Sequence, residues 1–422
     1  MREMRAGLTV LAGAAVLTGT AAGLAQEAGF SDIERGRYLA RVGDCVACHT
    51  AEGGEPFAGN RPIPTPFGTL YSANITPDRE TGIGGWSDAE FERAMTQGMA
   101  PGGKRLYPAF PYPFFTKATR DDIRAIKAWL DTLEPVRQEV DPPELPWPLS
   151  WRALLAGWNA LFFEEGVFTP VPGKSAEWNR GAYLVEGLGH CAACHSPKNL
   201  AGAVELDEAF EGGFGEGWFA PDLTGDLREG LGEWSVEDIV EYLKTGSNRF
   251  SSAGGPMAEV VERSTQHLTR EDLRAMAVYL EDLPAAEEVA EPGDVRDLDE
   301  LLMAEGEALF VDNCTGCHLM SGEGQEGVFP ALAGSSVLQQ EEPHSAIQIV
   351  LGGAEKPSTE AKPTPLAMPA LGWKLDDDEV AALLTYLRNA FGNSASPVEH
   401  STVTDVRSII EEREGTAALA SE

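Results

Sequence analysis

Apolar residues recur at helical spacing in three similar stretches of this 422-residue chain. Each stretch opens with a short amphipathic helix, predicted over 33–39, 178–184 and 304–310, and each helix holds one glycine that permits close helix contact. A closing helix is predicted over 119–133, 269–283 and 376–390, again with apolar residues three or four positions apart. The patterns predict an internal repeat of more than 100 residues.

Between the opening and closing helices, capping signals predict a further helix in each stretch. Ser87 with Glu90 and Ser235 with Asp238 form capping boxes, and the helices they begin end at Gly98 and Gly246. The third stretch has a plainer version over 344–352. Loops at 74–78, 221–226 and 329–334 precede these helices and are interpreted either as covers for a cofactor edge or as ordinary turns. The expected fold class is all-α, with three small helical domains.

These elements divide the chain into domains and linkers. Residues 1–25 combine two arginines, a short apolar run and small residues before Gln26, which is typical of a cleaved secretory signal peptide; a retained membrane anchor is the alternative. The expected boundaries are 26–140 for the first domain, 141–174 for a Trp/Pro-rich linker, 175–284 for the second domain, 285–300 for an acidic linker, 301–395 for the third domain and 396–422 for a polar tail that is partly disordered.

All six cysteines fall in three C-x-x-C-H motifs, one in each stretch. Two thiols three residues apart near a helix start can each form a thioether to the same porphyrin, and the next histidine then lies beneath the iron. A thioredoxin-like pair or half a zinc site would not explain the threefold recurrence. The motifs predict three covalently bound haem c groups, attached through Cys45, Cys48, Cys191, Cys194, Cys314 and Cys317, with His49, His195 and His318 as iron ligands.

The residues expected opposite these histidines differ between the stretches. Met257 lies 66 residues after Cys191, and Met368 lies 54 after Cys314, each in a predicted proline-bearing loop before the closing helix. Both are predicted as sixth ligands. In the first stretch Phe110 occupies the position that corresponds to Met257, and a phenyl ring cannot bind iron. Met99 is therefore carried as a tentative ligand, and an open or water-filled sixth position is the alternative.

The charge balance limits the partners of this chain. It contains 67 acidic and 32 basic residues and has a formal net charge of −35, so nucleic acid and an anionic bilayer would both repel it. Contact with a membrane would have to be hydrophobic. Three tryptophans within 147–158 suit a bilayer interface, although packing between haem domains or against a partner explains them about as well.

The motifs taken together resemble the three-haem cytochrome c subunits of bacterial membrane-associated dehydrogenases for alcohol, gluconate, sorbitol or fructose. The resemblance rests on the three C-x-x-C-H motifs, L-Y-P-A-F-P-Y at 106–112, G-P-M-A-E-V-V at 255–261, S-T-Q-H-L at 264–268 and M-P-A-L-G-W at 368–373. Many members have methionine where this chain has Phe110, and the phenylalanine version also looks like cytochromes that accompany molybdenum-containing hydroxylases.

The resemblance implies an electron-transfer subunit with no substrate chemistry of its own. Its partners would be a catalytic dehydrogenase subunit (a quinoprotein, flavoprotein or molybdoprotein) and ubiquinone, at the periplasmic side of the inner membrane. Two other functions are weighed against it. An open first haem would allow a peroxidase-like enzyme, but no convincing distal histidine or catalytic base lies near Phe110. A soluble periplasmic electron shuttle would need no membrane contact.

Overall fold

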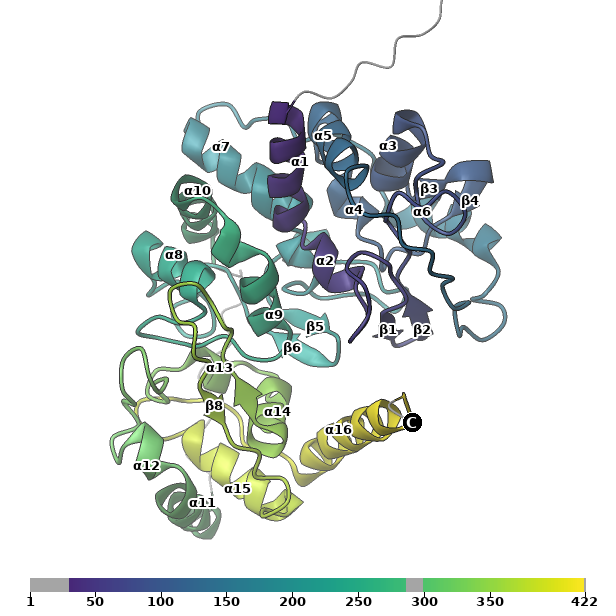
Figure 1. Ribbon diagram of the computed structural model, residues 1–422. Coiled ribbons are helices and arrows are strands. Elements are labelled where there is room, and N and C mark those ends of the chain that lie inside the picture. Colours follow the sequence, from purple (N-terminus) through teal and green to yellow (C-terminus); the bar gives the residue numbers. More distant parts are fainter. Residues whose placement is uncertain (1–29, 286–298, 421–422) are drawn as a thin grey trace, which may run out of the picture.

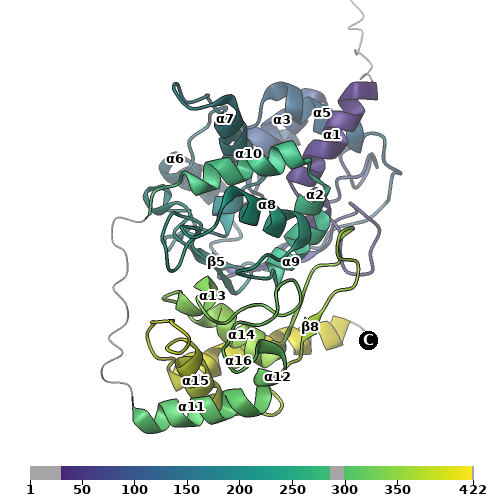
Figure 2. The same ribbon diagram turned by 90° about the vertical axis from the view of Figure 1, so that its left-hand side faces the viewer.

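The computed structural model describes residues 30–285 and 299–420. In Figures 1 and 2 the helices of residues 30–285 lie in the upper part of the molecule and those of residues 299–420 in the lower part. The predicted signal peptide lies outside the described residues, and so does nearly all of the acidic linker 285–300. The chain is 44% helix and 8% strand. All-α is thus a slight overstatement, because the described strands form four two-stranded antiparallel hairpins, in which loop N–H and C=O groups pair with each other.

The first segment follows the predicted order of helices. It contains α1 (Phe30–Val42), α2 (Cys45–Cys48), β1 (Pro62–Thr65), β2 (Gly68–Tyr71), α3 (Asp88–Gln97), β3 (Met99–Ala100), η1 (Pro101–Gly103), β4 (Lys104–Arg105), α4 (Tyr112–Phe115) and α5 (Arg120–Leu130). The capping box of Ser87 and Glu90 is present and Gly98 caps α3 in the left-handed conformation, as predicted. The expected linker 141–174 contains η2 (Arg152–Leu154) and α6 (Leu155–Phe162), and α6 packs on the first segment through Tyr112.

The second segment repeats the pattern with a π-helical turn after its first helix. Its elements are α7 (Ala176–Tyr183), η3 (Leu184–Leu188), η4 (Cys191–Ala193), η5 (Leu206–Glu208), β5 (Gly213–Gly215), β6 (Trp218–Ala220), α8 (Val236–Thr245), α9 (Pro256–Arg263), η6 (Thr265–His267) and α10 (Arg270–Glu281). The predicted capping box of Ser235 with Asp238 and the Gly246 cap are both confirmed.

The third segment has the same order and ends in an additional helix. It contains α11 (Glu300–Asn313), α12 (Thr315–His318), α13 (Ser336–Gln339), α14 (His344–Gly352), β7 (Ala354–Glu355), β8 (Ala367–Met368), α15 (Asp377–Leu387) and α16 (His400–Ala420). The expectation of a partly disordered tail is wrong for α16. Val403 and Val406 are fully buried against α14 and α15, and Arg407 pairs with Asp377, so packing stabilises a helix that the polar sequence had hidden.

Close contact between the opening and closing helices recurs in all three segments: α1 with α5, α7 with α10, and α11 with α15. A glycine lies at each crossing. A Cβ placed on Gly36, Gly181 or Gly306 would lie 1.8, 1.9 or 2.3 Å from a carbonyl oxygen of the partner helix, closer than any side chain tolerates. The prediction that these glycines permit close helix packing is therefore confirmed.

The first two segments share one hydrophobic core, whereas the third has its own. Two reciprocal hydrogen bonds link the first pair. Tyr38 of α1 donates to Asp272 at the start of α10 (2.6 Å), and Tyr183 of α7 donates to Asp122 at the start of α5 (2.5 Å). Each carboxylate also meets an arginine of its own segment. In the third segment Ala308 stands at the tyrosine position and Glu305 at the arginine position, so this link cannot form there.

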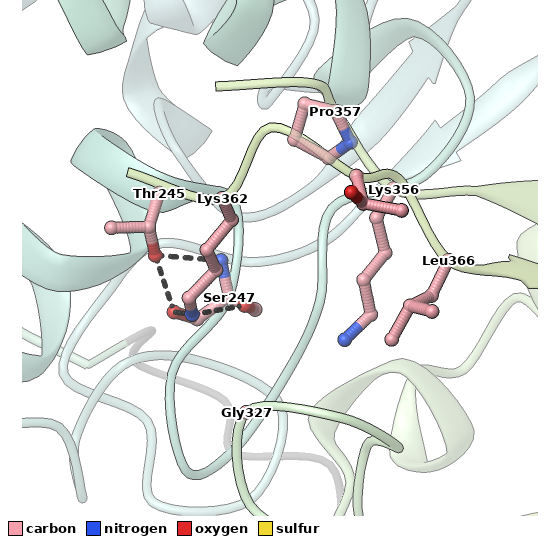
Figure 3. Close-up of a pocket in the computed structure, with 8 residues that line it drawn as sticks. Thr245, Ser247, Gly327, Lys356, Pro357, Lys362 and Leu366 are labelled. Carbon is pink, nitrogen blue, oxygen red and sulfur yellow. Dashed lines mark hydrogen bonds between the residues drawn. The ribbon is translucent and has the colours of Figure 1, made fainter. Parts of the chain in front are cut away.

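The third segment instead contacts the second through polar groups. Figure 3 shows one part of this boundary, where the Lys362 ammonium donates to the Ser247 hydroxyl at 2.8 Å. Elsewhere Ser345 donates to the carbonyl of Phe219 at 2.8 Å, and the Gln340 amide donates to the carbonyl of Glu229 at 2.6 Å. The third segment is thus held by directed hydrogen bonds, while the first two are held largely by apolar burial.

Candidate haem-binding sites

Each C-x-x-C-H motif occupies a short helical turn directly after the first helix of its segment. The turns are α2, η4 and α12. Asp44 and His190, which precede the first cysteines of their motifs, adopt the left-handed conformation, whereas Cys314 itself caps α11. The six thiols are not joined in disulfides. Burial raises the pKa of Cys45 and of Cys191 to about 12, which disfavours the thiolate that a redox pair or a zinc site needs.

The three motif histidines are held in the same way. Nδ1 of His49 lies 2.6 Å from the carbonyl oxygen of Ala73, Nδ1 of His195 lies 2.7 Å from that of Pro221, and Nδ1 of His318 lies 3.0 Å from that of Pro330. Because a carbonyl only accepts, each Nδ1 must carry the proton, which leaves Nε2 with its lone pair. Burial lowers the pKa of all three rings, so the neutral form that binds a metal is favoured.

The carbonyls of Pro221 and Pro330 belong to the loops singled out in the sequence at 221–226 and 329–334, and that of Ala73 directly precedes the loop at 74–78. In the first, the Asn74 carboxamide accepts from the backbone N–H and the hydroxyl of Thr76 (2.9 and 2.7 Å). In the second, Asp222 accepts from the N–H of Thr224. These local turns give the first two loops a fixed shape. The sequence identified the loops, but only the fold shows that each one orients a histidine.

The third segment contains a cavity that joins its site residues. His318, Cys314 and Met368 line one cavity that is partly open to solvent. The rest of the wall is mostly apolar and includes residues from α13, α14 and α15. An apolar cavity with a thiol and an imidazole on one side and a thioether in its lining fits a covalently attached haem with histidine and methionine ligands.

The other candidate ligands occupy different surroundings. Met257 lies in the first turn of α9, not in a loop as expected, because Pro256 starts a helix there; it packs against the shared core. Phe110 packs edge-on against Phe115, and Phe115 packs edge-on against His190, which directly precedes Cys191 (centroid distances 5.5 Å each). This row of rings runs from the first segment to the second haem motif.

Hairpin register distinguishes Met99 from Met368. Each follows the helix that ends at Gly98 or Gly353, but on different strands: Met368 pairs with Ala354, the residue after Gly353, whereas Met99 is itself the residue after Gly98 and pairs with Arg105. In the first segment, therefore, Arg105 stands at the register position of Met368, and Met99 at that of Ala354.

Arg61 is a site residue that sequence reasoning missed. Its guanidinium donates to the carbonyl of Ala47, inside the first motif, and makes two hydrogen bonds of 2.8 and 2.9 Å to the Glu259 carboxylate of α9. Since α9 also carries Met257, the Arg61 side chain links the first C-x-x-C-H motif to the helix that contains the ligand predicted for the second haem. The sequence around Arg61 contains no pattern that would predict Glu259, 198 positions away, as its partner.

Comparison with known proteins places this architecture. A family model for cytochrome c matches residues 33–134 and 303–391. The chain is 40% identical over 396 residues to the gluconate 2-dehydrogenase cytochrome c subunit of Pantoea cypripedii, covering 89% of each chain. It is also 40% identical over 388 residues to the cytochrome c subunit of the quinone-type alcohol dehydrogenase of Gluconobacter oxydans, covering 88% of this chain and 81% of the relative.

A third relative is considerably longer. The chain is 43% identical over 364 residues to one subunit of the nicotinate dehydrogenase of Pseudomonas putida, and the match covers 85% of this chain but only 30% of that relative. The gluconate and alcohol dehydrogenase relatives are electron-transfer subunits and not the catalytic subunits of their complexes. From the three motifs, the matched helices and these identities, the chain belongs to the family of cytochrome c subunits of dehydrogenase complexes.

Proposed function

We propose that this chain is a three-haem electron-transfer subunit, built from three tandem cytochrome c domains, that passes electrons from a catalytic dehydrogenase subunit to ubiquinone or another respiratory acceptor. The observation that carries the proposal is the threefold recurrence of one arrangement. Each C-x-x-C-H motif follows a glycine-bearing helix, and each histidine donates Nδ1–H to a loop carbonyl. When bound, haem supplies the one-electron chemistry, and the chain sets its ligands, orientation and exposure to water.

The proposed ligands follow the sequence and the cavity. His49, His195 and His318 would bind iron through Nε2, with Met257 and Met368 opposite the second and third histidines. The six motif cysteines would hold the porphyrins. For the first haem, Met99 is the tentative ligand, but the hairpin register, which puts Arg105 where Met368 stands, supports the open alternative.

The haem count is the direct test. A pyridine haemochrome assay on the purified chain should give three haems per polypeptide, and mass spectrometry should find haem on each of the three motif peptides. Two haems per chain would contradict the three-site proposal. Reduction of all three by a cognate dehydrogenase with its substrate would support the electron-transfer role, and lack of reduction by any co-purified dehydrogenase would contradict it.

A peroxidase-like activity at the first haem is a second candidate, favoured by Phe110 and by the register of Met99. Carbon monoxide binding to the reduced protein separates the two. Binding at one haem, together with peroxide turnover, would support the enzyme. If no haem binds carbon monoxide, the first iron has a sixth ligand and Met99→Leu should then create a carbon monoxide site.

We further propose that the subunit is exported and lies peripherally on the membrane. Among residues 30–285 and 299–420 no helix is long and apolar enough to cross a bilayer. Support for surface contact comes from an exposed aromatic surface formed by Trp147 and Trp151, which are 84% and 62% exposed. Arg152, which directly follows Trp151, donates to the carbonyl of Arg105, so β4 lies next to this segment.

The local charge of this surface differs from that of the whole chain. Residues 99–112 and 146–163 contain three basic side chains, Lys104, Arg105 and Arg152, and no acidic one. At physiological ionic strength charges more than about 8 Å away are largely screened, so distant carboxylates would oppose lipid binding only weakly. Tryptophan rings beside arginine and lysine are the usual composition of an interfacial anchor.

A further inference from the structure

The cavity of the third segment is closed in part by the second segment. Its lining includes Phe250, Ser251 and Ser252, which belong to the loop between α8 and α9 and lie more than 60 positions before Cys314. The same cavity is lined by His318 and Met368, the proposed ligands of the third haem. A second-segment side chain therefore shares a wall with the iron ligands of the third.

The loop that carries Phe250 is firmly held. Asn248 is buried; its carboxamide N–H₂ donates to the carbonyl of Asp238, and its carboxamide oxygen accepts from the backbone N–H of Phe250 and of Ser251, all at 2.9 Å. Arg249 makes two hydrogen bonds to the Asp238 carboxylate, at 2.9 and 3.1 Å. These hydrogen bonds all lie within the second segment, so they fix the conformation of the loop without help from the third segment.

The ring of Phe250 is fixed from two directions. The indole of Trp234 stacks on it with a centroid distance of 5.3 Å and an interplanar angle of 8°, and the Arg249 guanidinium lies 4.1 Å from its centroid. Trp234 in turn packs against the core shared by the first two segments. At the start of the same loop, Ser247 accepts from Lys362 of the third segment, so the loop is clamped at the boundary (Figure 3).

We propose that Phe250 is a positioning residue for the third haem: held by Trp234, it covers the haem of the neighbouring segment, keeps water from it and thereby raises its reduction potential. This inference rests on the proposed three-haem function. The physical reason is that oxidised haem iron carries one more positive charge than reduced iron and is stabilised more strongly by water. An apolar cover disfavours the oxidised form, so solvent access lowers the potential.

Redox titration of the full-length haem-loaded chain tests the proposal. The third-haem component is assigned as the one whose midpoint falls in Met368→His, since methionine ligation raises the potential. Phe250→Ser should shift that component alone about tenfold toward the oxidised form, a lowering of about 59 mV for a one-electron couple. Phe250→Leu, which keeps an apolar cover, should restore most of the wild-type midpoint.

Phe214 offers a matched control. It also belongs to the second segment and packs against His344 of the third at 4.9 Å, but it is not among the residues that line the cavity. Phe214→Ser should leave the third midpoint unchanged. An unchanged midpoint in Phe250→Ser, or an equal shift of all three haems, would overturn the inference while leaving the three-haem function intact. Absence of haem on the wild-type peptide that contains His318 would overturn the proposed function as well.

Discussion

Removing the hydroxyl of Tyr183 should destabilise the pairing of the first two segments. This hydroxyl donates to the buried carboxylate of Asp122 at 2.5 Å and accepts from the backbone N–H of Thr119 at 3.0 Å. A hydrogen bond to a charged group contributes about 1.5–3 kcal/mol, and a donor left unpaired in a buried place costs about 1–3 kcal/mol. Because Thr119 is only partly buried, losing the bond from its N–H should cost less than the full penalty for an unpaired buried donor. Tyr183→Phe should therefore lower the free energy of unfolding by about 3 kcal/mol.

Removing the hydroxyl of Tyr38, which makes the reciprocal contact, should lower the free energy of unfolding by less. Tyr38 donates to Asp272 at 2.6 Å, but it accepts from the N–H of Thr269 over a longer 3.3 Å, and Asp272 keeps two hydrogen bonds from Arg180. We expect Tyr38→Phe to cost about 1.5 kcal/mol. Burial alone would raise the pKa of Asp272, but the hydrogen bonds from Arg180 and Tyr38 hold it below its ordinary value.

Urea unfolding followed by circular dichroism measures both variants. Tyr386→Phe, in the third segment, is the control, because its ring packs on Phe310 and Phe391 of that segment. A double-mutant cycle of Tyr183→Phe with Asp122→Asn should show a coupling above about 1 kcal/mol. A loss below about 0.5 kcal/mol in Tyr183→Phe, or a larger loss in Tyr38→Phe, would refute the reasoning.

The same variant has a pH signature. Burial, with the hydrogen bond to Asp122, raises the pKa of Tyr183 to about 12 from its ordinary value of 10, so the folded state holds this proton more tightly than the unfolded state. The stabilisation is fully present below about pH 10 and is lost as the pH rises from about 10 to 12, at about 1.4 kcal/mol per pH unit. Tyr183→Phe should flatten this decline, and an unchanged slope would contradict the assignment.

Two further predictions concern helix crossing and lipid contact. Gly306→Ala should lower the free energy of unfolding by about 3 kcal/mol and reduce the haem bound at the third motif, because the new Cβ overlaps a carbonyl. Gly157→Ala in α6 is the control, because no atom lies within 4 Å of the new Cβ, and it should not destabilise the protein. Equal haem content in the two variants would contradict this prediction. The wild-type chain should co-sediment with vesicles of phosphatidylcholine and phosphatidylglycerol, and a Trp147→Ser, Trp151→Ser double variant should do so much less. Trp373→Ser is the control, because Trp373 is 82% exposed but lies in the third segment, and it should bind like the wild type. Equal binding by the double variant would exclude the surface formed by Trp147 and Trp151 as the anchor.

Local chemistry made much of this protein readable from its sequence. A C-x-x-C-H motif, a capping box or a helix-ending glycine is complete within a few residues, so the positions of α3, α8, α14 and the three closing helices could be predicted to within a few residues. The helix-crossing glycines could be recognised for the same reason, since close packing requires a residue without a side chain.

Contacts between distant positions had no such signature. The first and second domains expected from the sequence share one hydrophobic core, and Tyr38 and Tyr183 each also reach a carboxylate in the other segment. The polar tail forms α16 because its few valines meet an apolar face that only the folded third segment provides.

The sequence by itself predicted three haem attachment motifs and the histidine proposed to bind each iron. Only the tertiary structure decided which loop carbonyl orients each histidine, and that Phe250 of one segment lines the cavity of the next. The physical reason is the range of the interactions. Covalent attachment and helix capping act within one turn of the chain, whereas a ring's burial and its effect on a redox site depend on surfaces that meet only after folding.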